Sequence, residues 1–264
     1  MSTVNRLMPR GRRRGEDSGL LLLVPILLLT LWYLTTRNAA FGVPTPTGVV
    51  EAAQGLVEDG RLLAGLGTSL LRVLQGFAIA LVVGSFTGIA MGRIRAVRWI
   101  VDPLVETLRP IAPIALVPLA ILWLGTGTAS STAIVTYAAF FPITLNVYAA
   151  ARDVDSSLVN AAYTFGVKPW VVLTQVVLPS VLPGVAVGAR LGMGLAWTSV
   201  IAAELAVGVS SEGSPGVGQL MMIFYQFEVD PNPIVVCMIA VGVVGLTLDL
   251  LLRRLSQRVM PWNT

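Results

Sequence analysis

Long runs of hydrophobic residues, separated by short polar segments, make up most of this chain. Six of the runs are close to the roughly 20 residues that a helix needs to cross a bilayer. They cover residues 19–36, 65–91, 108–125, 132–151, 182–207 and 233–252. Lipid offers the backbone no hydrogen-bond partners, and the runs lack the ten-residue alternation of barrel strands, so each is predicted to be a helix. The pattern therefore predicts an all-α, polytopic membrane protein with six transmembrane helices.

Composition supports this class and argues against several others. Only 12% of the 264 residues are charged, whereas a soluble domain carries about 25%. Cys237 is the single cysteine, so the chain cannot form an internal disulfide. The sequence contains no histidine, which argues against a zinc or haem site.

Positive charge gathers in alternate connecting segments. The residues concerned are Arg6, Arg10, Arg12, Arg13 and Arg14, then Arg93, Arg95 and Arg98, then Arg152 and Lys168, and finally Arg253, Arg254 and Arg258. The other connections contain only Arg37 and Arg61. The positive-inside rule then places the basic N-terminus, 1–18, and the C-terminus, 253–264, in the cytoplasm. A hydrophobic run follows the arginine cluster directly, which argues against a nucleic-acid-binding tail.

The first hydrophobic run is expected to remain as a membrane anchor, because no clear small-x-small cleavage site follows it. The segment 37–64 is then external. Pro44 and Pro46 keep its start extended, and Thr47 is expected to cap a short amphipathic helix over 48–58. Val49, Val50, Ala53 and Val57 would lie on one side of that helix, as a lid on the bundle. The remaining five helices form a core over 65–252.

Two of the predicted helices carry small residues at four-residue spacing. These are Gly76, Ala80, Gly84, Gly88 and Gly92 in one, and Gly184, Gly188 and Gly192 in the other. Small residues let helix backbones approach closely, and packing drives helix association in lipid. Both ridges are expected to be helix–helix contacts.

A polar insert interrupts the apolar pattern at 152–181, in the predicted cytoplasm. A first short helix would begin at Asp155 or Ser156 as the cap and stop at Gly166 in the left-handed conformation. Pro169 suits the first turn of a second helix, and Pro179 is expected to end it. The insert is therefore predicted to be a helix–glycine–helix elbow on the inner face of the membrane.

At this elbow the sequence resembles the permease subunits of bacterial ABC importers. Their cytoplasmic motif has the form E-A-A, three residues, G, nine residues, I-x-L-P. The matching positions here are Asn160, Ala161, Ala162, Gly166, Val176, Leu178 and Pro179, without a gap. Asn160 replaces the usual acid, which puts a charged contact from that position in doubt, and Val176 conservatively replaces isoleucine.

The resemblance extends over nearly the whole chain, including "VPTPTGVVEAA" and "GTSLLRVLQGFAIALVVGSFTGIAMG". These segments are similar to the subgroup that serves nitrate, sulfonate, taurine, bicarbonate and related small solutes. The resemblance implies a type I importer fold in the bacterial inner membrane, with two permease copies, expected to be identical, around a central path. It also implies a cytoplasmic ATPase dimer that binds ATP and Mg²⁺, an external solute-binding protein, and a coupling helix from Asn160 to Gly166 that enters the ATPase.

The sequence itself is consistent with ATP binding on a separate chain. No G-x-x-x-x-G-K-[ST] phosphate loop occurs in the sequence, so the chain lacks the usual ATP cradle. Energy must come from a partner chain or from an ion gradient. We expect a transport subunit that is not itself an enzyme, has no cofactor of its own and does not bind nucleic acid.

Charged residues within membrane spans are costly and often functional. Arg190, Gly194, Trp197, Ile201 and Glu204 share one helical stripe, and Met193 lies next to it. Fourteen residues place Arg190 and Glu204 roughly 21 Å apart, too far to pair. Arg190, Met193, Trp197 and Glu204 are candidates to line the path. Snorkelling, pairing between helices and packing are the alternative roles for these side chains.

Arg72 and Asp249 are the other two charged candidates within the predicted spans. Arg72 could pair with an acid on a neighbouring helix, and Asp249 with Arg253 one turn away.

Two other functions stay open at this stage. An ion-driven secondary transporter would need its own coupling-ion site, often between inverted repeats, and a membrane enzyme would need a cluster of reactive groups. The resemblance favours a small anion as solute, with import of a neutral or aromatic precursor as the alternative.

Overall fold

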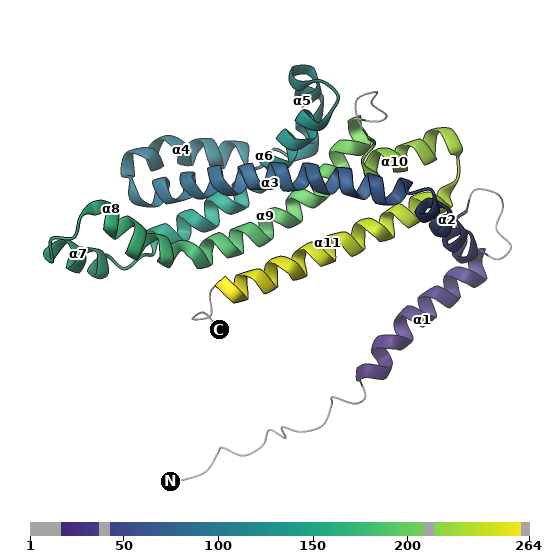
Figure 1. The fold of residues 1–264 in the computed structure, drawn as a ribbon, viewed down its shortest axis with the longest axis horizontal. Coiled ribbons are helices and arrows are strands. Elements are labelled where there is room, and N and C mark those ends of the chain that lie inside the picture. Colours follow the sequence, from purple (N-terminus) through teal and green to yellow (C-terminus); the bar gives the residue numbers. More distant parts are fainter. Residues whose placement is uncertain (1–16, 37–42, 208–213, 260–264) are drawn as a thin grey trace, which may run out of the picture.

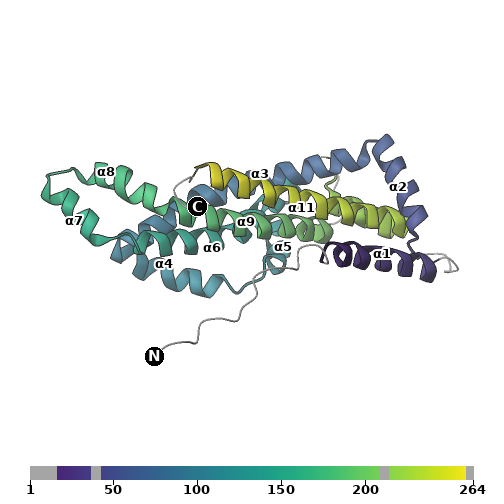
Figure 2. The same ribbon diagram turned by 90° about the horizontal axis from the view of Figure 1, so that it is seen from below.

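The computed structural model describes residues 17–36, 43–207 and 214–259, and the regular elements within these ranges are helices. In chain order they are α1 (Asp17–Thr36), α2 (Pro46–Glu58), α3 (Arg61–Arg93), α4 (Arg95–Leu108), η1 (Pro113–Leu116), α5 (Val117–Leu124), α6 (Thr128–Arg152), α7 (Ser156–Thr164), α8 (Pro169–Val172), η2 (Leu173–Val177), α9 (Leu178–Val207), α10 (Val217–Ile223), η3 (Phe224–Glu228) and α11 (Pro231–Val259). The bundle is elongated, with α7 and α8 at one end and α2 at the other (Figure 1, Figure 2). We call these the elbow end and the α2 end. The arginine cluster at 6–14 lies outside the described residues.

Four helical segments are long and apolar enough to cross a bilayer. They are α3, α6, the continuous run Pro169–Val207, and Pro231–Arg258 within α11. Each of them contains one of the predicted spans. The first predicted span, 19–36, falls within the 20 residues of α1, of which Ile26–Thr36 is an apolar helix. The prediction of an all-helical membrane protein is confirmed for the described residues.

The predicted third span, 108–125, is not one helix, so its boundaries were wrong. α4 ends at Leu108, and a 3₁₀ turn, η1, leads into α5. The two parts are bent by 92°, and together they could form a fifth, broken span. Two prolines explain the break. Pro110 has no N–H with which to continue the hydrogen bonds of α4, and Pro113 disfavours a helical residue before it, where Ala112 is extended. Two donors outside α4 satisfy its last carbonyl, that of Leu108: the hydroxyl of Tyr137 in α6 at 2.6 Å and the backbone N–H of Ile111 at 3.0 Å.

Helix α6 lies between the two glycine ridges at the centre of the bundle. A Cβ on Gly88 of α3 would lie 2.7 Å from the carbonyl oxygen of Thr144, and one on Gly188 of α9 would lie 2.9 Å from the Cα of Ile143. Both distances are too short for a side chain, so only glycine allows α3 and α9 to approach α6 this closely. The predicted role of the ridges in helix packing is confirmed.

Helix α2 forms as expected, but it begins earlier and buries a different face. Thr45, and not Thr47, is its cap: the Thr45 hydroxyl accepts the N–H of Gly48 at 3.1 Å. Pro46 then occupies the first turn, where its missing N–H costs nothing. Val49 and Leu56 are buried, whereas Val50 and Val57 of the predicted face are exposed. The contacts of α2 with α11 and α3 decide which face is covered.

Candidate functional site

The elbow begins with the short helix α7, which contains Asn160, Ala161 and Ala162. Asp155 caps it, because its carboxylate accepts the N–H of Ser157 at 2.8 Å. This backbone hydrogen bond, with a weaker contribution from the Ser157 side chain, lowers the pKa of Asp155. The cap is therefore ionised at neutral pH, at the helix end where negative charge is favourable. Of the two predicted caps, Asp155 is the one used.

Gly166 ends α7 in the left-handed conformation, with φ of 74°. The N–H of Val167 donates to the carbonyl of Ala162 at 3.1 Å, and the N–H of Gly166 donates to that of Tyr163 at 2.9 Å. This pair of bonds is the Schellman motif, which satisfies the last carbonyls of a helix. The predicted glycine stop is confirmed.

The second half of the elbow differs from the prediction at its end. Pro169 starts α8 as expected, but Pro179 does not end the helix. Helix α8 continues through a π-helical turn, η2, into α9, and Leu178 donates its N–H to the carbonyl of Leu173 across that turn. A wider π turn accommodates a proline that can neither donate an N–H nor fit the regular spacing. Leu178 and Pro179 therefore lie in the first turn of a membrane-spanning helix.

One side of the elbow is anchored and the other is exposed. Val159, Val172 and Val177 belong to the main hydrophobic core. Phe165 (86% exposed) and Trp170 (71% exposed) point away from that core. The polar end of the bundle thus presents large apolar side chains from a firmly packed support, which is typical of a protein-binding surface.

At mid-bundle, the α9 stripe with Arg190 and Trp197 packs against α11. Arg190 forms a bidentate ion pair with Asp249, at 2.6 and 2.9 Å, and both side chains are about half exposed. Trp197 is buried and donates its indole N–H to the carbonyl of Val241 at 3.0 Å. The suggested pairing of Asp249 with Arg253 was wrong, because Asp249 faces α9. Met193 is also buried, within the core.

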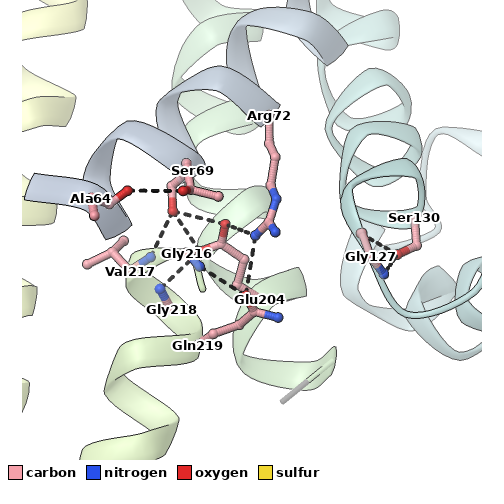
Figure 3. A network of polar contacts seen from close by, with 11 residues as sticks. Ala64, Ser69, Arg72, Gly127, Ser130, Glu204, Gly216, Val217, Gly218 and Gln219 are labelled. Atoms are coloured by element: carbon pink, nitrogen blue, oxygen red, sulfur yellow. Dashed lines mark hydrogen bonds and ion pairs between the residues drawn. The ribbon is translucent and has the colours of Figure 1, made fainter. Parts of the chain in front are cut away.

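Towards the α2 end, Glu204 lies in a buried polar network (Figure 3). Its carboxylate is 0% exposed, and it pairs with Arg72 of α3, 2% exposed, at 2.8 Å. The hydroxyl of Ser69 donates to the same carboxylate at 2.8–2.9 Å. Of the alternatives for Glu204, pairing between helices is realised and outward snorkelling is not. The suggested acidic partner of Arg72 is confirmed as Glu204.

The same network holds the start of α10. Gly218 donates its N–H to the Glu204 carboxylate at 3.0 Å, and Val217 donates its N–H to the Ser69 hydroxyl at 2.9 Å. Gln219 accepts the N–H of Gly216 at 2.9 Å. A Cβ on Gly216 would collide with the carboxylate. Sequence reasoning missed Ser69 and Gln219; the three-residue spacing of Ser69 and Arg72 on one helix face was the available signal.

Comparison with known proteins decides what this architecture is. Residues 80–261 match the family model described as the binding-protein-dependent transport system inner membrane component. The chain belongs to this family. It is 32% identical to a putative aliphatic sulfonates transport permease protein of Bacillus subtilis, over 98% of this chain and 92% of that protein. It is also 32% identical to a taurine transport system permease protein of Escherichia coli, over 89% of this chain and 86% of that protein.

A solved structure shares the fold of this permease. A chain of the MetNI methionine ABC transporter, in an inward-facing conformation, superposes with a TM-score of 0.61 at 19% identity. The match covers 75% of the permease and 96% of that chain. The fold is therefore that of an ABC importer permease, as the elbow motif predicted.

Proposed function

We propose that this permease works with a separate ATPase chain, which binds ATP and Mg²⁺, and that the elbow is where the ATPase docks. The exposed apolar side of the elbow is the observation that carries this proposal. Phe165 and Trp170 project from it, while Val159 and Val172 tie it to the core. Because the elbow is packed rigidly against the core, a movement of the docked ATPase would be transmitted to α6 and α9, which flank the elbow. Asn160, Ala161, Ala162 and Gly166 would then form the docking helix and its turn, and Leu178 and Pro179 its junction with α9.

The proposed orientation places both chain ends and the elbow in the cytoplasm, with α2 on the outer surface of the inner membrane. The distribution of arginine supports it: Arg93, Arg152 and Arg258 lie in the last turns of helices α3, α6 and α11. An external binding protein would deliver solute at the α2 end. A second, identical permease would complete the translocation path, because a single bundle would line only one side of it.

For the solute we propose a small anion with sulfonate-like chemistry. The two named relatives are permeases for aliphatic sulfonates and taurine. Arg190 supports the proposal because its guanidinium is half exposed at mid-helix, where a cation offsets the cost of desolvating an anion. Met193, Trp197 and Glu204 would then set the position of α9 along the path.

Reconstitution with the ATPase tests the coupling role. Phe165→Ala and Phe86→Ala form a matched pair, because both phenylalanines are largely exposed, at 86% and 77%, but only Phe165 lies on the elbow. Loss of a central aromatic anchor weakens an interface by about 10-fold or more. We expect Phe165→Ala to lose ATPase in co-purification and Phe86→Ala to retain it. Equal retention by the two variants would show that the elbow is not the docking site.

Transport in vesicles tests the energy source. Uptake of a labelled sulfonate should require ATP and should persist when ion gradients are collapsed. Uptake that follows the gradient without ATP would instead favour a secondary transporter.

Native mass measurement tests the stoichiometry, and it should find two permeases and two ATPases in the complex.

A further inference from the structure

A second polar feature lies at the elbow end, outside the elbow itself. It is a cavity of about 700 Å³ between the end of α3, the first half of α4 and the end of α6. Arg93, Arg95, Arg98 and Arg152 line it, together with one acid, Asp102. Arg152 is the last residue of α6, and α7 begins at Ser156, so the cavity lies beside the elbow, where the bundle meets the polar phase.

The charge of this cavity is not balanced by the protein. Four guanidinium groups face one carboxylate, and within the described ranges none of the five residues forms an ion pair. The contact found for Arg98 is with the ring of Tyr148, 5.6 Å from its centroid. Arg98 and Tyr148 are both half-buried, so this contact fixes the guanidinium at the cavity wall. Clustered arginines without acidic partners favour a ligand with phosphate-type oxygens, which the planar guanidinium binds in bidentate fashion.

The surroundings of the cavity indicate where that phosphate comes from. Trp99 lines the cavity and is 71% exposed, and Ile100 and Leu104 beside it are also exposed. Tryptophan at such a place is typical of the boundary between hydrocarbon and headgroups. A free anion needs no apolar rim, whereas a lipid needs both the basic cavity for its headgroup and an apolar flank for its acyl chains.

We propose that this cavity binds the headgroup phosphate of an anionic phospholipid from the leaflet at the elbow end. Arg95, Arg98 and Arg152 hold the phosphate, and the acyl chains lie along the exposed apolar side of α4. Asp102 accepts hydrogen bonds from headgroup hydroxyls, which favours phosphatidylglycerol. The bound lipid would brace the α3–α4 corner against the end of α6, next to the elbow. This proposal does not depend on the solute or on ATPase docking.

Lipid retention by the purified full-length permease tests the proposal. The protein is exchanged into detergent with equal amounts of phosphatidylglycerol and phosphatidylcholine, and the bound lipid is counted by native mass spectrometry. An arginine near a lipid surface contributes about fivefold in affinity, so Arg95→Gln with Arg98→Gln should reduce phosphatidylglycerol retention on the order of 25-fold. Arg253→Gln with Arg254→Gln is the matched control, because it removes the same charge from α11, outside the cavity. The control should retain phosphatidylglycerol as the unmodified protein does, because Arg253 and Arg254 do not line the cavity.

Arg95 is exposed, so Arg95→Gln alone should keep the fold and still lose about fivefold. Equal losses in the cavity and control variants would overturn the proposal in favour of diffuse surface attraction. If the unmodified protein retains phosphatidylcholine as well as phosphatidylglycerol, the proposal is overturned too. Displacement of the lipid by millimolar inorganic phosphate or by a sulfonate would identify a free-anion site instead.

Discussion

Arg72 of α3 and Glu204 of α9 are 132 positions apart in the chain, yet they form an ion pair in which both side chains are buried. The hydroxyl of Ser69 and the N–H of Gly218 in α10 also donate hydrogen bonds to the carboxylate. The buried Nε of Arg72 has no hydrogen-bond partner within the described ranges. The pair therefore joins α3, α9 and α10 at the α2 end through two buried charges that compensate each other.

Removing one charge of this pair should destabilise the permease strongly. Glu204→Gln leaves the guanidinium of Arg72 buried and uncompensated, which costs about 3–5 kcal/mol. Asp249→Asn is the control, since it breaks a half-exposed pair that contributes no more than about 1 kcal/mol. Thermal unfolding in detergent should show a much larger decrease in Tm for Glu204→Gln. Similar decreases for both variants would mean that the buried pair is not a structural clamp.

The space around Gly166 would accept a side chain, but its left-handed backbone conformation disfavours one. A Cβ there would meet no atom within 4 Å, but φ is +74°, where a residue with a Cβ costs about 1–2 kcal/mol. Gly166→Ala should therefore loosen the turn between α7 and α8 and reduce ATPase stimulation by solute. Gly67→Ala, also open in space but within α3, should be neutral or slightly stabilising. Normal solute-stimulated hydrolysis in Gly166→Ala would exclude the turn as the transmitting element.

The glycine ridges should not accept larger residues. Gly88→Val would force α3 away from the backbone of α6 at Thr144, and such overpacking costs about 1–3 kcal/mol. Gly242→Val, on an open face of α11, is the control. Folded yield and Tm should fall for Gly88→Val alone. If Gly242→Val lowers them equally, valine in a membrane helix and not the ridge contact is responsible.

The half-exposed pair of Arg190 and Asp249 gives a test of the anion path. Arg190→Gln should slow sulfonate uptake while leaving the ATPase attached, and Asp249→Asn should not. The exchange variant, Arg190→Asp with Asp249→Arg, restores the ion pair but moves the cation from α9 to α11. If exchange restores full uptake, the pair is only structural. A transport defect that persists in a stably assembled exchange variant supports contact between Arg190 and the anion.

Much of the fold could be predicted from the sequence because the bilayer imposes local rules. Each hydrophobic run must form a helix in lipid, and each glycine ridge must face another helix. The elbow was equally local: Asp155, Gly166 and Pro169 act on backbone groups within a few residues of themselves. The prolines around residue 110 were also a local signal, and they produce the bend that the predicted span 108–125 overlooked.

Tertiary structure alone decided which charged side chains meet. The helical stripe placed Arg190 and Glu204 on one side of α9, but their partners, Asp249 and Arg72, come from different helices. Such pairing depends on the rotation and depth of each helix relative to its neighbours, which no single helix encodes. The buried face of α2 has the same origin, because packing against α3 and α11 can outweigh a local preference of order 1 kcal/mol.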